Sequence, residues 1–176
     1  MAKHHLPVRG TTSDGANVTI SEVDLGFLTQ IAGWQRFEEA AERTLRAIGL
    51  SLPSNYRTPV RANGSTVWRI APDKALIRSE APISLEDSED IVVLDLSQAR
   101  VRLTVEGTGA ASLLSRLIAL DFSEVAFPAD TFVQTSLHHV GILVERRARE
   151  AFTVYIPTTW AVSLMGLVED HLVRAA

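Results

Sequence analysis

The sequence contains no cysteine among its 176 residues. This absence excludes disulfide bonds, thiolate metal sites and cysteine nucleophiles, and it is compatible with a reducing compartment. Long hydrophobic runs are lacking too, since no stretch approaches the ~18 apolar residues that a membrane-spanning helix requires. The first residues carry no apolar segment typical of a signal peptide. We therefore expect a cytoplasmic protein with no membrane partner.

The sequence also has no excess of positive charge. It contains 17 Lys and Arg residues and 21 Asp and Glu residues, which gives a formal net charge of −4. A basic face that neutralises phosphates is the simplest route to nucleic acid, so we expect no nucleic acid partner. Hydrophobic residues make up 46% of the chain, which is enough for a buried core and argues against disorder. The length fits one domain, or two small halves that share a core.

Polar, turn-rich residues fill positions 1–16, which we interpret as a flexible N-terminal arm. We assign residues 17–176 to a single domain. The clearest helix in it covers residues 34–48, where apolar residues recur at steps of three and four and form one stripe: Trp34, Phe37, Ala41, Leu45 and Ile48. Trp68 and Trp160 are likewise expected on core-facing stripes, with an interface anchor as the alternative role for Trp160.

Short or alternating apolar runs predict strands on both sides of a second helix. They cover residues 18–31, 66–70, 75–78, 91–96 and 101–105 before the helix at 110–120, and residues 132–145 and 152–156 after it. Residues 146–149 are the predicted hairpin tip, and Thr158 or Thr159 caps a final helix. Helices over half-buried antiparallel strands predict an α+β two-layer sandwich of two loosely repeated strand–helix–strand halves.

The predicted strand over residues 132–145 carries apolar residues on both faces. Such a strand needs cover on both faces. Since the helices supply one layer, we expect another protein chain to supply the second. The candidate partner interface consists of polar residues along this strand and a tryptophan at the start of the final helix, a residue type enriched at interfaces: Gln134, Ser136, His138, His139 and Trp160.

No group of residues forms a convincing catalytic, cofactor or metal site. Gly107-Thr108-Gly109 lies between a strand and a helix, but Ser112 stands where a dinucleotide fingerprint needs its third glycine, so we interpret the motif as a tight turn. His138 and His139 are neighbours in the predicted strand and would point to opposite faces, which hinders joint metal binding. We expect no catalytic residue, cofactor ligand or metal ligand in this chain.

Several short motifs resemble the gamma subunit of heterotetrameric sarcosine oxidase. They include Asp95-Leu96-Ser97 with residues 100–107, and then residues 113–116, 120–121, 127–128, 134–146, 152–157 and 161–164. The likeness spans most of residues 23–172 and is densest from residue 94 onward. The chain departs from the family pattern at Thr158-Thr159-Trp160, where a basic residue, Ser and an aromatic residue are expected, and at Met165-Gly166-Leu167, where an aromatic residue is expected.

This resemblance implies a fold similar to the folate-binding aminomethyltransferase domain and a role as an accessory, non-catalytic subunit. The family's complex oxidatively demethylates sarcosine, or a related N-methyl amine, in a reaction linked to tetrahydrofolate. The implied partners are alpha, beta and delta subunits, which are expected to hold FAD, FMN, NAD, tetrahydrofolate and zinc. No family catalytic residue carries over to this chain.

Two other hypotheses stay open. In one, the chain is a free-standing folate-binding module of the same fold, which requires a concave pocket with a carboxylate or amide for the pterin edge. Asp95 is the only acid inside a predicted apolar strand. In the other, the chain is a small independent enzyme such as an aminomethyltransferase, although it lacks a credible acid–base constellation.

Overall fold

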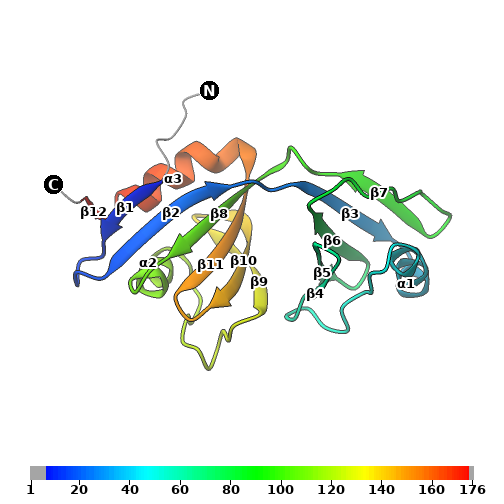
Figure 1. Cartoon of the computed structure of the whole chain (residues 1–176), viewed down its shortest axis with the longest axis horizontal. Helices are drawn as coiled ribbons and strands as arrows, with labels where there is room; N and C mark the ends of the chain where they lie inside the picture. Colours follow the sequence, from blue (N-terminus) through cyan, green and yellow to red (C-terminus); the bar gives the residue numbers. More distant parts are fainter. Residues whose placement is uncertain (1–6, 175–176) are drawn as a thin grey trace. The chain divides into compact units, whose positions relative to one another are not determined.

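Two compact units make up the chain in the computed structural model, which describes residues 7–174 (Figure 1). The first unit combines the residues up to Asp24 with those from Ala99 onward, and the second is the continuous segment Leu25–Gln98. Each unit has its own antiparallel sheet and its own hydrophobic core. The segment that we predicted as one domain, residues 17–176, therefore contains two cores.

The first unit is built on a seven-stranded sheet with the strand order β12-β1-β2-β8-β11-β10-β9. The strand bounds are β1 Val8–Thr11, β2 Asn17–Val23, β8 Arg100–Glu106, β9 Thr131–Leu137, β10 Val140–Ala148, β11 Ala151–Pro157 and β12 Val173–Arg174. Part of the predicted N-terminal arm thus belongs to the sheet, because β1 pairs with β2 and β12. Residues 1–6 of that arm lie outside the described residues.

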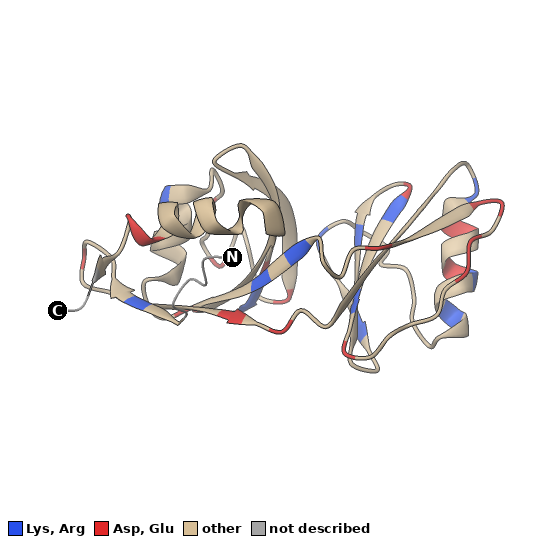
Figure 2. Cartoon of the chain, turned by 90° about the horizontal axis from the view of Figure 1, so that it is seen from above, with Lys and Arg blue, Asp and Glu red and all other residues tan. Residues whose placement is uncertain are grey.

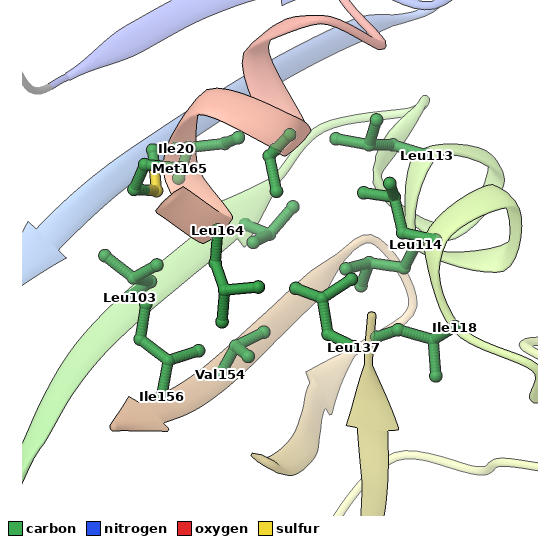
Figure 3. A pocket seen from close by; sticks show the side chains of 13 residues that line it. Ile20, Leu103, Leu113, Leu114, Ile118, Leu137, Val154, Ile156, Leu164 and Met165 are labelled. Atoms are coloured by element: carbon green, nitrogen blue, oxygen red, sulfur yellow. The ribbon is translucent and has the colours of Figure 1, made fainter. Parts of the chain in front are cut away.

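Two helices, α2 (Ala110–Leu117) and α3 (Ala161–Glu169), cover one face of this sheet. Their spacing turns Leu113 and Leu114 of α2 and Leu164 and Met165 of α3 inward, where they meet strand residues in one apolar core (Figure 3). The chain enters α3 through a short 3-10 helix, η1 (Thr158–Trp160), with no side-chain cap. The predicted threonine cap is therefore wrong.

The second unit has a five-stranded sheet of order β4-β5-β6-β3-β7, with α1 (Phe37–Ala47) packed on one face. The strand bounds are β3 Phe27–Gly33, β4 Val60–Ala62, β5 Ser65–Ala71, β6 Lys74–Ser79 and β7 Ile91–Asp95. The predicted helical stripe is confirmed at Phe37, Ala41 and Leu45, which are buried. Its first member is an exception, because Trp34 precedes the helix and is 62% exposed.

The outer side of α1 carries charges of both signs (Figure 2). Glu42 and Arg46, one helical turn apart, form an ion pair of 3.4 Å between Oε2 and Nε. This arrangement is typical of a solvated helix face. None of the helices in the described part of the chain is long and apolar enough to cross a membrane.

Residues 132–145 form a hairpin, so the prediction of one long strand was wrong. β9 ends at Leu137, His138 and His139 form a two-residue turn, and β10 begins at Val140. The two histidines have φ values of +46° and +70°, the left-handed backbone of a type I′ turn. Leu137 pairs with Val140, and both belong to the core. The mixed faces of the predicted strand reflect this reversal and give no reason to expect a second chain over it.

Candidate functional site: a cleft at Asp95

The predicted interface residues are all accessible on the first unit. Gln134 and Ser136 are exposed on β9, an edge strand of the sheet, and the turn after it exposes His138 and His139. The two imidazole rings have centroids 5.5 Å apart, so they lie beside each other instead of on opposite faces of a strand. Trp160 on η1 is 50% exposed. Accessibility is what an interface role requires, and that role stays a prediction.

The described residues bring no three His, Asp or Glu side chains together as a metal site. The Gly107-Thr108-Gly109 turn is accounted for by packing. Gly107 has a φ of +117°, and a Cβ there would collide with the carbonyl oxygen of Asn17. A Cβ at Gly109 would lie 2.7 Å from the carbonyl oxygen of Ala16. Both glycines let the start of α2 approach the start of β2, which supports the tight-turn interpretation.

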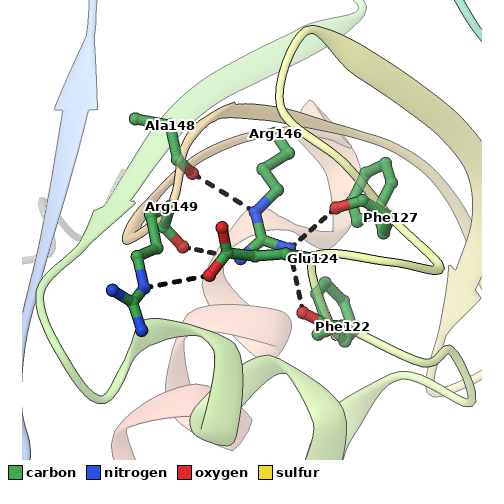
Figure 4. Close-up of polar contacts among 6 residues, drawn as sticks. All are labelled: Phe122, Glu124, Phe127, Arg146, Ala148 and Arg149. Atoms are coloured by element: carbon green, nitrogen blue, oxygen red, sulfur yellow. Dashed lines mark hydrogen bonds and ion pairs between the residues drawn. The ribbon is translucent and has the colours of Figure 1, made fainter.

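Arg146, which we assigned to the exposed hairpin tip, is instead 2% exposed in β10 (Figure 4). Its Nη1 donates hydrogen bonds to the carbonyl oxygens of Phe122, at 2.9 Å, and Phe127, at 2.7 Å. Nε and Nη2 donate to the carbonyl oxygens of Ala148 and Arg149, at 3.3 and 2.7 Å. Four of its five N–H groups are thus used on main-chain acceptors, so Arg146 ties the segment after α2 to the β10–β11 hairpin.

The apolar void between the sheet and the helices of the first unit is a packing defect. Only hydrophobic side chains line it, among them Leu113, Leu137 and Leu164 (Figure 3). Its volume is about 20 Å³, close to the minimum that one water needs, and a water would find no polar partner there. This void cannot hold a substrate or a cofactor.

A larger cleft with polar lining lies within the second unit and has a volume of about 340 Å³. It is lined by Phe27 and Thr29 of β3, Val93 and Asp95 of β7, residues 82–85 of the loop after β6, and Ser97. We call it the Asp95 cleft. Its volume falls within the range of about 300–1,000 Å³ that is typical of small-molecule sites.

Strand alternation explains why these residues share one face of the sheet. Ile31 and Ile91 belong to the core under α1, and steps of two along β3 and β7 lead from them to Thr29 and Asp95. These two residues are direct partners in the β3–β7 register. On this face of β7, Ile91 and Val93 pack in or against the core under α1, and the next residue, Asp95, lies beyond it.

Asp95 is held in one orientation by Ser97. Its Oδ1 accepts a hydrogen bond of 2.6 Å from the Ser97 hydroxyl and one of 2.9 Å from the Ser97 N–H. The same hydroxyl oxygen accepts a hydrogen bond of 3.1 Å from the N–H of Leu28. These hydrogen bonds from Ser97 hold the pKa of Asp95 below its ordinary value of 3.8. The carboxylate is therefore ionised at neutral pH.

The remaining oxygen of Asp95, Oδ2, has no hydrogen-bond partner within the described segment of residues 7–174. Hydroxyl groups of Thr29 and Ser84 line the same cleft, and Phe27, 39% exposed, adds an aromatic side chain. The sequence singled out Asp95 as an acid inside an apolar strand. It gave no signal for the loop at 82–85, which reaches the cleft because Ile83 and Leu85 pack against the core.

Together the two units define an α+β protein with two antiparallel sheets, one covered on one face by α2 and α3 and the other by α1. No model of a known family matches the sequence, and no curated protein matches it either. Among solved structures, a chain of heterotetrameric sarcosine oxidase from Corynebacterium sp. U-96, in complex with pyrrole 2-carboxylate, is similar with a TM-score of 0.76. The match has 21% identity and covers 97% of this chain and 91% of that chain.

The glycine cleavage system aminomethyltransferase T from Bartonella henselae is also similar, with a TM-score of 0.56 and 13% identity. This match covers 85% of our chain but only 44% of that protein, so the chain spans less than half of its length. At these identities the comparisons show the fold. They confirm the predicted α+β fold and its likeness to both sarcosine oxidase and an aminomethyltransferase.

Proposed function

We propose that this chain is an accessory, non-catalytic subunit of a sarcosine oxidase-type complex, in the position of the gamma subunit. The supporting observation is the extent of the structural match, which covers nearly all of both chains. The sequence motifs from Asp95 to residue 164 support the same proposal.

In this proposal the chain binds alpha, beta and delta subunits in the cytoplasm. Those partners hold FAD, FMN, NAD, tetrahydrofolate and zinc, and this chain holds none of these cofactors. The complex oxidises sarcosine or a related N-methyl amine. A permanent contact of this kind buries on the order of 2,000 Å² or more. Trp160 and Val162, 50% and 54% exposed, offer apolar surface for it at the start of α3.

Co-expression of the full chain with candidate alpha, beta and delta subunits tests this proposal. We expect a flavin-containing complex that co-purifies through size-exclusion chromatography. Trp160→Ser should weaken the association about tenfold or more, as is typical of a buried aromatic anchor. Trp34→Ser is the matched control, because Trp34 is also exposed, at 62%, but is not in the predicted interface.

Failure of the unaltered chain to co-purify would reject the subunit role. Equal effects of the two tryptophan substitutions would reject only the placement of the interface at Trp160. The two results are distinguishable, because the first is measured on the unaltered chain and the second only on the two tryptophan variants.

The alternative function, a free-standing folate-binding module, is favoured by one observation. That hypothesis needs a carboxylate in a concave pocket, and Asp95 lies in a cleft of about 340 Å³. Calorimetric titration of the isolated full chain with tetrahydrofolate tests it. Saturable binding that Asp95→Asn abolishes would support this module, whereas absence of heat exchange at millimolar folate would reject it.

A further inference from the structure

We propose that the Asp95 cleft binds a small organic ammonium ion, with the cationic nitrogen at Asp95 and an apolar or aromatic substituent against Phe27. This inference is independent of the subunit role, because every lining residue belongs to the segment Leu25–Gln98.

The charge of the lining selects a cation. No Lys, Arg or His lines the cleft, and Asp95 is its one ionisable side chain. The acidic segment Glu86-Asp87 follows the lining residue Leu85 directly, and Asp87 reaches back to accept a hydrogen bond of 2.7 Å from the N–H of Val93. Asp95 itself is an exposed residue of the lining. Negative groups in the lining and next to it in the sequence attract a positive ligand and repel anions.

The geometry of Asp95 selects an ammonium ion over a planar amidinium or guanidinium ion. Planar cations bind carboxylates best through two parallel hydrogen bonds, one to each oxygen. Here Oδ1 already accepts two hydrogen bonds from Ser97, at 2.6 and 2.9 Å. Oδ2 remains as a single acceptor, which suits the point charge of an ammonium group. Thr29 and Ser84 also line the cleft, and their side chains carry hydroxyl groups that accept hydrogen bonds from ammonium protons.

The remaining lining selects an apolar substituent. Phe27, Ile83, Leu85 and Val93 supply hydrophobic side chains beside the polar groups. An aromatic ring also attracts a cation that lies over its face. A turn role for Asp95 and Ser97 explains the hydrogen bonds to Oδ1, and it leaves Oδ2 of the exposed Asp95 accessible to a ligand in the cleft.

Heteronuclear NMR of the full chain, with amide signals of Thr29, Ser84 and Val93 as reporters, provides the test. The probes share one ring: benzylamine is the ammonium, benzyl alcohol is its neutral counterpart, and benzamidine is the planar cation. We expect saturable shifts with benzylamine at millimolar concentration, and affinity at least about tenfold weaker for benzyl alcohol, which lacks the charge-assisted hydrogen bond. Benzamidine should also bind more weakly than benzylamine.

Asp95→Asn keeps the shape of the side chain and an acceptor for Ser97, and it should lower benzylamine affinity about tenfold. Asp73→Asn, in the turn between β5 and β6 and outside the cleft, is the matched control and should bind as the unaltered chain does. Equal affinity of benzylamine for both variants, tighter binding of benzamidine or benzyl alcohol, or shifts confined to other regions would each overturn the proposal.

Discussion

Arg146 and Phe127 are joined by a hydrogen bond of 2.7 Å from Nη1 to the main-chain carbonyl oxygen, in a place where Phe127 is 1% exposed. The guanidinium carbon also lies 5.0 Å from the ring centroid of Phe152. Phe122, Phe127 and Phe152 pack around one another with centroid distances of 5.6–6.3 Å. Arg146 thus donates hydrogen bonds to the main chain of Phe122 and Phe127, and the rings of these two residues pack with Phe152 in an aromatic cluster.

Replacement of this arginine should therefore destabilise the first unit strongly. Arg146→Met retains apolar bulk but leaves buried carbonyl groups without donors, so we expect a loss of about 3 kcal/mol in the free energy of unfolding. Urea denaturation followed by circular dichroism measures this loss. Arg149→Met is the control, because Arg149 is 78% exposed and pairs with an exposed Glu124; a loss of at most about 1 kcal/mol is expected there. Similar losses in both variants would contradict the structural role of Arg146.

The glycine at position 107 should not tolerate alanine. Its φ of +117° is strained for any side chain, and the added Cβ would meet the carbonyl oxygen of Asn17. We expect Gly107→Ala to cost about 2 kcal/mol or more in thermal or urea unfolding. Gly166→Ala in α3 meets no atom within 4 Å and should instead stabilise the chain by about 0.5–1 kcal/mol. Equal and small effects at the two positions would argue against the close approach of β2 and α2.

The histidine turn should become more stable with residues that favour a left-handed backbone. His138 and His139 both have positive φ, which costs about 1 kcal/mol for an ordinary residue. The double substitution His138→Asn and His139→Gly introduces the sequence that type I′ turns prefer. We expect a gain of about 1 kcal/mol in the free energy of unfolding, measured by urea denaturation. Loss of stability would show that the histidine side chains make contacts that outweigh the backbone strain.

Acid should destabilise the fold through three hydrogen-bonded aspartates. A hydroxyl of Thr12 lowers the pKa of Asp14, Ser97 lowers that of Asp95, and the N–H of Ser123 lowers that of Asp121, all from 3.8. A carboxyl group with a lowered pKa in the folded state contributes stability above its unfolded pKa, and this contribution disappears as the pH falls through the folded value. The stability should therefore fall below about pH 4.

The variant Asp121→Asn should show a shallower loss of stability than the unaltered chain between about pH 4 and pH 2. Glu39→Gln on α1 is a suitable control, because Glu39 is exposed and outside these turns. An unchanged acid profile in Asp121→Asn would mean that the Ser123 hydrogen bonds do not persist in solution.

Two turns of the same type show what sequence patterns could and could not predict. Asn63 and Gly64, with φ values of +52° and +71°, join β4 to β5. Asn-Gly is the strongest short signal of a hairpin, so β4 was predictable, although our predicted strands include nothing between residues 31 and 66. His138-His139 adopts the same kind of backbone without turn residues, because pairing of the long strands β9 and β10 overrides local preference.

A second signal in that segment was available but was misinterpreted. The members of the helix-covered core are Leu137 before the turn and Val140, Ile142 and Val144 after it, so the core-facing side changes from odd to even numbers. A continuous strand cannot do this without a bulge, whereas a two-residue hairpin produces it directly. The helices, by contrast, were predicted well, since amphipathic spacing at Phe37 or Leu113 depends on local periodicity alone.

Only part of the Asp95 cleft could be predicted from the sequence. The position of an acid at the end of an apolar strand is a local pattern, and so is the Asp95–Ser97 spacing of a turn. The approach of residues 82–85 is not local, because it depends on how Ile83 and Leu85 pack against side chains far away in the sequence. The same limit applies to Arg146, whose acceptors lie as far as 24 residues away.

The division of the first unit into two chain segments has a consequence for synthesis on the ribosome. β2 can pair with its second neighbour only after β8 has been synthesised, and β1 can pair with its second neighbour only after β12, almost at the end of the chain. The sheet of residues 25–98 does not depend on the rest of the chain, because all of its strands lie in this one continuous segment. During translation, the middle of the polypeptide can thus acquire its core first, while the N-terminal hairpin remains without the strands that complete its sheet.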